Sequence, residues 1–200
     1  MRYLSSILLL AVFAVPAAPL SQGDRDRALS ELHATRKMFL DAVANLSEAQ
    51  WRWKPAPDRW SIAECAEHVV LTETELFQKV VGEILKSQPH PERATEEQRA
   101  KDQQILKRMA DRSSKAQAPK SLRPSGKYWS PEELVAVFKK TRDRTIAFVR
   151  DTQADLRSHF APMGSEELDA YQWILAIAGH TARHVKQIQE IKNSPGFPAQ

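Results

Sequence analysis

The stretch from Tyr171 to Ile191, YQWILAIAGHTARHVKQIQEI, constrains the fold most, because its pattern is that of one long amphipathic helix. Its inward positions, at steps of four and three, are Trp173, Ile177, His180, His184, Gln187 and Ile191. Two histidines therefore lie on the buried side. At 3.6 residues per turn, His180 and His184 are about one turn apart, roughly 6 Å along the axis. One metal ion could bind both imidazole rings.

The histidine pair has two interpretations. Two buried imidazoles can be satisfied by separate hydrogen bonds to backbone or side-chain partners. They can also share a cation, which satisfies both rings at once on an apolar face. The pair is not the His-Glu-x-x-His signature of metalloproteases, because Thr181, Ala182 and Arg183 stand between the histidines. A hydrolytic use would need its base from another part of the chain.

Residues 1–23 are predicted to be a signal peptide. Arg2 precedes an apolar run from Leu4 to Val15, and small residues follow this run. Cleavage after Ala17 and cleavage after Gly23 both fit the rule that small residues precede the cut. The run is shorter than the roughly 20 apolar residues of a membrane-spanning helix. We therefore expect a periplasmic or secreted protein without stable membrane insertion after signal removal, and a retained anchor is the alternative.

The rest of the chain suits a single domain, predicted to span residues 24–194 with a loose tail at 195–200. The formal net charge is +4, but basic and acidic residues are interleaved, and no Lys/Arg run with aromatic residues indicates nucleic-acid binding. The single cysteine, Cys65, excludes an internal disulfide. We expect Cys65 to be a small core residue.

Three further amphipathic helices are predicted at residues 24–46, 61–87 and 130–151. The second begins with a capping box, Ser61 to Glu64, and the third with Ser130 followed by proline. Between them lies a strongly charged insertion that is expected to contain a solvated helix. Residues 47–60 and 159–168 are interpreted as a linker and a turn. Four long helices without strand patterns predict an all-α four-helix bundle.

Other candidate residues are less certain from periodicity. His68 lies at the margin of the apolar side of its helix, and the spacing does not decide whether it faces the core. Glu64, one turn earlier, could orient His68, but the cap is its simpler role. His33 is expected to be an ordinary boundary residue. Trp60 is expected to form a wall over the core.

Several short motifs together resemble the DinB-like superfamily, a group of metal-binding four-helix bundles that includes thiol-dependent S-transferases. The stretch Trp51 to His68 contains the run Trp-Lys-Pro-Ala-Pro-x-x-Trp-Ser-Ile-Ala-Glu-x-x-x-His. The last helix contains His-x-x-x-His followed by Gln187 and Ile188, and Ser121 to Phe138 resembles the approach to the third helix. With the matching order of helices, the resemblance covers nearly all of the chain after the signal.

The resemblance implies a divalent-metal site formed by His68, His180 and His184. Three neutral imidazoles leave coordination positions open for water or substrate. Zinc, nickel, iron and manganese all remain candidates, because the ligand set does not choose between them. A metal with an open position lowers the pKa of a bound water or thiol. The resemblance thus implies an S-transferase or hydrolase acting on a small molecule, with a thiol among the candidate substrates and catalytic residues unassigned.

Two alternatives to an enzyme stay open. One is an exported bundle that binds a metal or small ligand without turnover, and the other is a structural bundle whose histidines are satisfied internally. The predicted export weakens the transferase reading, because small thiol cofactors are chiefly cytoplasmic. The resemblance also implies a homodimer, although no exposed apolar stripe in the sequence indicates one.

Overall fold

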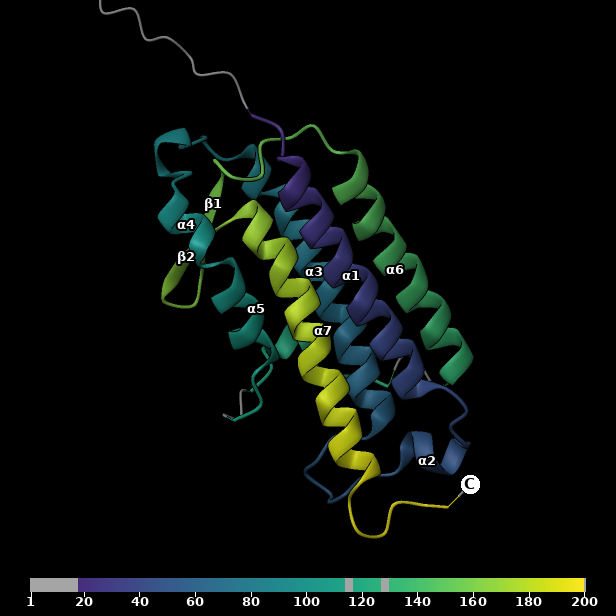
Figure 1. Ribbon diagram of the computed structural model, residues 1–200. Coiled ribbons are helices and arrows are strands. Elements are labelled where there is room, and N and C mark those ends of the chain that lie inside the picture. The colour runs from purple at the N-terminus through teal and green to yellow at the C-terminus, as the bar shows by residue number, and fades with distance from the viewer. Residues whose placement is uncertain (1–17, 114–116, 127–129, 200) are drawn as a thin grey trace, which may run out of the picture.

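The structure is a computed structural model that describes residues 18–113, 117–126 and 130–199. Its four long helices are α1 (Gln22–Val43), α3 (Ile62–Gly82), α6 (Pro131–Asp151) and α7 (Ala170–Lys192). Helices α1 and α7 run in one direction, and α3 and α6 run in the other (Figure 1). The predicted all-α four-helix bundle is confirmed. Within the described ranges, no helix has the length and apolar character needed to cross a membrane.

Each long helix begins at a side-chain cap. The caps are Ser21, Ser61, Ser130 and Asp169. At α3 the Ser61 hydroxyl accepts from the backbone N–H of Glu64 at 3.1 Å, and the Glu64 carboxylate accepts from the Ser61 N–H at 2.8 Å. This confirms the predicted capping box. Asp169 and Gln172 form a second capping box at α7, which was not predicted.

The segment predicted as a turn before the last helix is instead a β-hairpin. Strand β1 (Phe160–Met163) pairs antiparallel with β2 (Glu166–Asp169). Gly164 takes a φ of 67° in the tight turn between the strands. The strands are short, and β1 contains Pro162, a residue that is rare inside strands. These features explain why the sequence pattern did not indicate the hairpin.

The predicted linker at residues 47–60, which contains Trp51, Trp53 and Trp60, folds across one end of the bundle (Figure 1). It contains a short helix, α2 (Glu48–Arg52), which was not predicted. Ser47 and Gln50 form a capping box at the start of α2. Trp51 of this helix is completely buried in the core. Burial of this large ring explains why so short a helix is retained in the fold.

The C-terminal tail was predicted to be loose, and its described part is instead held against α2. The Phe197 ring packs edge to face on Trp53, with the ring centroids 5.5 Å apart. The Gln50 side-chain amide donates to the Pro198 carbonyl oxygen at 3.0 Å. The aromatic contact stabilises the tail because Phe197 would otherwise leave its ring in water.

The charged insertion between α3 and α6 packs along α7 (Figure 1). Helix α3 ends at Gly82 rather than at residue 87, and short helices follow: η1 (Ile84–Lys86), η2 (Pro91–Arg93), α4 (Glu96–Ala100), α5 (Asp102–Ala110) and η3 (Lys120–Leu122). At Gly179, an added Cβ would lie 2.7 Å from the Met109 Cβ, so glycine allows α5 to approach α7. Residues 170–179 of α7 are therefore buried on all sides, not on one seam.

A buried polar layer crosses the middle of the bundle. Arg142 of α6 is fully buried, and its guanidinium donates to both oxygens of Glu73 in α3 at 2.9–3.1 Å. It also donates to the hydroxyls of Thr35 in α1 and Thr181 in α7, at 2.9 and 2.8 Å. Every long helix thus contributes to the layer. The role of Arg142 was not predicted, because the local sequence pattern does not distinguish it from an arginine on an exposed helix face.

The polar layer separates two hydrophobic clusters. The cluster toward the hairpin includes Leu32, Phe77, Ile146 and Ile177. The cluster toward α2 includes Phe39, Val70, Phe138 and Val185. Along each of the four long helices, the residue of the layer lies between a residue of one cluster and a residue of the other. The layer therefore fixes how far each helix is shifted along its neighbours.

Candidate metal centre

Three histidines from two helices meet in the half of the bundle toward α2. The Nε2 atom of His180 lies 3.1 Å from Nε2 of His68 and 3.1 Å from Nε2 of His184. The three potential ligand atoms all lie within 4.8 Å of one another. In the described part of the chain, no other group of three His, Cys, Asp or Glu residues has this spacing. The structure brings the three predicted residues together and turns His68 inward, which periodicity left open.

The spacing of the nitrogen atoms suits a shared cation. Two imidazole nitrogens bound to one metal at about 2.1 Å lie roughly 3.0 to 3.4 Å apart when the angle at the metal is about 90 to 110°. The two separations of 3.1 Å fall in this range. One turn of α7 provides the pair His180 and His184, and the inward face of α3 provides His68.

Hydrogen bonds at Nδ1 fix the tautomers of two of the rings. His68 Nδ1 donates to the backbone carbonyl of Leu122 at 2.7 Å. His184 Nδ1 donates to Oε1 of Gln187 at 2.9 Å. Both partners are oxygen acceptors, so Nδ1 carries the proton in each ring. The Nε2 atoms of His68 and His184 therefore present unprotonated lone pairs to Nε2 of His180.

The insertion supports the centre from outside. Arg112, just after α5, donates to Oε1 of Gln187 at 3.2 Å and to the Glu190 carboxylate at 2.6 Å. The bond from Arg112 identifies Oε1 as the acceptor atom of the Gln187 amide. Leu122, whose carbonyl accepts from His68, also belongs to the insertion. No site residue was predicted in this segment.

Burial keeps the imidazoles neutral near pH 7. Loss of contact with water lowers the pKa of His68 and places the pKa of His180 well below its ordinary value. The same cause lowers the pKa of His184 to about 3. Repulsion from the neighbouring imidazoles and from Arg183 adds to the effect at His180 and His184. The neutral imidazole is the form that binds metal ions.

The Nε2 atoms favour one of the two interpretations of the histidines. Separate hydrogen bonds account for Nδ1 of His68 and of His184. At the centre, however, one proton on Nε2 of His180 would have to serve two acceptors, each 3.1 Å away. A shared cation satisfies all three lone pairs. The donor set therefore fits a divalent metal ion better than a structural cluster.

The DinB superfamily profile matches residues 31–188, a range that contains all three histidines. The chain belongs to the DinB superfamily. It is 27% identical over 165 residues to the uncharacterised protein YuaE of Bacillus subtilis (strain 168), and the match covers 82% of this chain and 96% of YuaE. The resemblance drawn from the sequence motifs is therefore confirmed.

A solved structure has a similar fold. YfiT from Bacillus subtilis is described as a probable metal-dependent hydrolase with an unusual four-helix bundle topology. It superposes with a TM-score of 0.55 at 12% sequence identity, covering 92% of this chain and 95% of YfiT. At this identity, the likeness shows that the DinB fold is shared.

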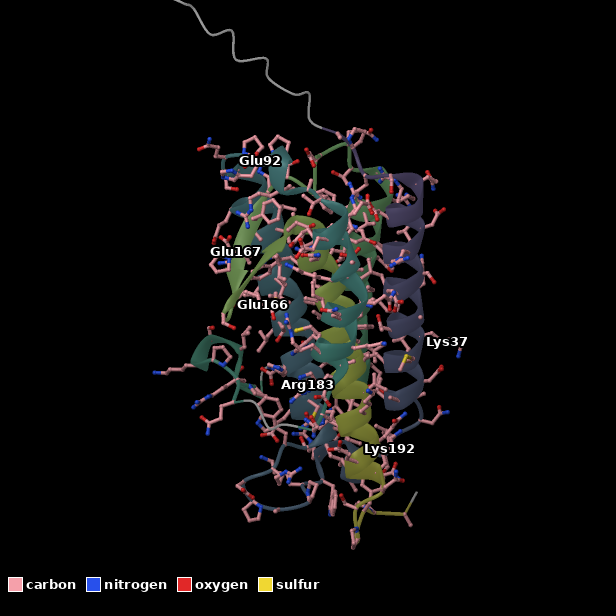
Figure 2. All side chains as sticks on the ribbon, turned by 60° about the vertical axis from the view of Figure 1, so that its left-hand side comes forward. Lys37, Glu92, Glu166, Glu167, Arg183 and Lys192 are labelled. Carbon is pink, nitrogen blue, oxygen red and sulfur yellow. The ribbon has the colours of Figure 1, made fainter. Side chains whose placement is uncertain are left out.

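Trp60, which was predicted to form a wall over the core, lies beside the histidines in this DinB-superfamily bundle. Its ring centroid lies 4.9 Å from that of His68 and 6.3 Å from that of His184. Figure 2 shows Arg183 on the half of α7 that lies away from the hairpin residues Glu166 and Glu167.

The remaining candidates take the simpler roles that the sequence suggested. Cys65 is fully buried in the core, and burial raises the pKa of its thiol. Glu64 caps α3 and pairs with Lys54 at 2.7 Å, so it does not orient His68. His33 is exposed on α1 and lies outside the histidine cluster.

Glu67 attaches the approach to α6 beside the centre. Its carboxylate accepts from the backbone and the hydroxyl of Ser125 at 2.9 and 2.8 Å, and from the backbone of Gly126 at 2.8 Å. Glu67 directly precedes His68 in α3. Adjacent residues of α3 thus bind two points of the same connection, since Leu122 accepts from His68.

Proposed function

We propose that this protein binds one divalent metal ion through Nε2 of His68, His180 and His184 and is a metal-dependent hydrolase. The observation that carries the proposal is the convergence of three Nε2 atoms. In His68 and His184, the bonds from Nδ1 to Leu122 and Gln187 leave Nε2 unprotonated, with its lone pair free to bind a metal. The description of YfiT as a probable metal-dependent hydrolase supports the reaction class.

The chain's own residues hold and shape the centre. A divalent metal with three protein ligands has open positions and supplies Lewis acidity, which lowers the pKa of a water molecule or polarises a carbonyl group. The Trp60 ring packs against one side of the imidazoles. Glu64 and Glu67, the carboxylates nearest to His68 in α3, are engaged by other partners. We therefore assign no protein base.

Metal content tests the first half of the proposal. The purified protein is loaded separately with zinc, nickel, iron(II) or manganese, because imidazole ligands do not select among them. Inductively coupled plasma mass spectrometry should find about one ion per chain in the wild type and a large loss in His180→Ala. His33→Ala is the matched control, since His33 is exposed on α1. A wild type that binds none of these metals and gains no thermal stability from them would contradict the proposal.

Turnover tests the second half. The metal-loaded protein is assayed against ester, amide and phosphoester substrates, and in parallel against a small thiol with an electrophile. Hydrolysis should be lost in His184→Ala while the far-UV circular dichroism spectrum keeps its helical form. Thiol transfer without hydrolysis would identify an S-transferase instead. Metal binding without either reaction would support the alternative of a non-catalytic binding protein.

A further inference from the structure

The first described residues belong to the folded domain although they fall within the predicted signal peptide. Leu20 is buried in the hydrophobic cluster toward the hairpin. The Ser21 hydroxyl caps α1 by accepting from the Asp24 N–H at 3.1 Å. Cleavage after Gly23 would remove both features. It would also place a positive amino group at the start of α1, where the helix dipole disfavours positive charge.

Asp155 is a buried carboxylate in the connection between α6 and β1. Its Oδ1 accepts from the backbone N–H groups of Arg157 and Ser158 at 3.0 and 3.1 Å. Its Oδ2 lies 3.4 Å from the backbone nitrogen of Ala18. The Arg157 guanidinium is directed to other carboxylates, among them Asp24. Among the described residues, Asp155 forms no ion pair with a basic side chain.

A cation beside Asp155 would stabilise the fold, because this buried carboxylate has only neutral N–H partners and burial of a charge is costly without an opposite charge. In the uncut chain, the nitrogen of Ala18 belongs to a neutral peptide bond. In a chain that begins at Ala18, the same nitrogen is an ammonium group, since the α-amino pKa is about 7.7 to 8.0. The sequence allows this cut, with Val15 and Ala17 at the two positions that require small residues.

We propose that a signal peptidase cuts between Ala17 and Ala18, and that the new amino terminus of Ala18 forms an ion pair with the buried Asp155 carboxylate. Hydrolysis consumes one water molecule and breaks the C–N bond between the two residues. Ala17 leaves as a carboxylate, and its acid proton passes to the nitrogen of Ala18. Removal of the signal thus completes the charge balance at the hairpin end of the bundle, and the chain is an exported protein.

The position of the cut is tested by exporting the full chain in a bacterial host and determining the amino terminus of the purified protein by sequencing and intact mass. Ala18 should be the first residue. Ala17→Leu should accumulate the uncut chain, because the peptidase requires a small residue there. Gly23→Leu should be cut normally, and a Cβ at Gly23 meets no atom within 4 Å. A terminus at Asp24, or processing blocked by Gly23→Leu instead, overturns the proposal.

The ion pair is tested by thermal unfolding of two chains released from a cleavable fusion. One begins at Ala18, and the other carries one extra glycine before Ala18. Each is made with Asp155 and with Asp155→Asn. The glycine and the substitution should each lower the Tm by about 5 °C, and together they should lower it little further, because both remove the same ion pair.

The exposed Asp26 of α1 provides the control, and Asp26→Asn should shift the Tm of both chains by less than about 1 °C. If Asp155→Asn lowers the Tm equally in both chains, the carboxylate acts only through its bonds to Arg157 and Ser158, and the ion pair is refuted. The ion pair is also refuted if the chain with the extra glycine has the same Tm as the chain that begins at Ala18. Both chains in this comparison keep Asp155.

Discussion

Arg142 and Glu73 form a fully buried ion pair between α6 and α3, with Nε and Nη2 of the guanidinium 2.9–3.1 Å from the carboxylate oxygens. The guanidinium also donates to Thr181, the residue that follows His180 in α7. Because α3 carries His68 and α7 carries His180, the Arg142 guanidinium connects the two helices of the candidate metal centre through its bonds to Glu73 and Thr181.

Breaking this pair should destabilise the protein strongly. Arg142→Met leaves the Glu73 carboxylate buried without its cation, and we expect the free energy of unfolding to fall by about 3 to 5 kcal/mol. Arg36→Met is the control, since Arg36 pairs with the exposed Asp143 and should cost less than about 1 kcal/mol. Urea unfolding followed by circular dichroism measures both. If Arg142→Met and Arg36→Met lower the free energy of unfolding equally, the buried ion pair stabilises the fold no more than the exposed one.

Substitution of glycine by alanine should affect stability differently at Gly179, where α5 closely approaches α7, and at Gly82, where a Cβ has open space. In Gly179→Ala, the new Cβ would lie 2.7 Å from the Met109 Cβ and 3.0 Å from the Leu106 carbonyl, so stability should fall by about 1 to 3 kcal/mol. At Gly82, the end of α3, a Cβ meets nothing within 4 Å. Gly82→Ala should be neutral or stabilising by roughly 0.5 to 1 kcal/mol. If Gly179→Ala and Gly82→Ala lower the melting temperature by the same amount, the predicted clash at Gly179 is wrong.

Gln187 should affect metal affinity without being a ligand. Gln187→Ala removes the acceptor that holds the proton on Nδ1 of His184, and we expect affinity to fall roughly 10- to 100-fold. Competition with a chromophoric chelator measures this change. Gln189→Ala, at an exposed position of the same helix, should leave the affinity unaltered. Unchanged binding in Gln187→Ala would mean that the hydrogen bond does not orient the ring.

The metal-free protein should lose stability as pH falls. The pKa of His184 is about 3 in the fold, against an ordinary value of 6.5, because the ring is buried. Between these values, the unfolded chain binds more protons at this group than the folded chain does. The free energy of unfolding is therefore not reduced by this group above about pH 6.5, and it falls progressively as the pH decreases toward 3. Urea midpoints at pH 7.5 and 5 should differ less in His184→Gln than in the wild type, whereas His33→Gln should keep the full difference.

The long helices were predictable because their signals are local. Caps such as Ser61 and apolar spacing lie within one segment of chain, so α6 and α7 were located almost to the residue. The hairpin was missed because two strands of four residues give little alternation, and Pro162 lies in one of them. The early end of α3 at Gly82 was missed because the apolar spacing continues into η1.

The site was only partly predictable. His180 and His184 followed from helical spacing, whereas His68, at the margin of its apolar stripe, was assigned through the family resemblance. Arg142 and Arg112 act through contacts between segments far apart in the chain, and the sequence pattern marks them as ordinary surface charges. Their roles depend on how the helices pack.

The acceptor for His68 is a main-chain oxygen, that of Leu122. Side-chain substitution at position 122 cannot delete this atom, so mutation can alter the interaction only by shifting the path of the connection that carries it. Insertions or deletions between α3 and α6 should therefore change the basicity of the His68 ring while all three ligands stay the same. Proteins of this fold with identical histidines can in this way diverge in metal preference.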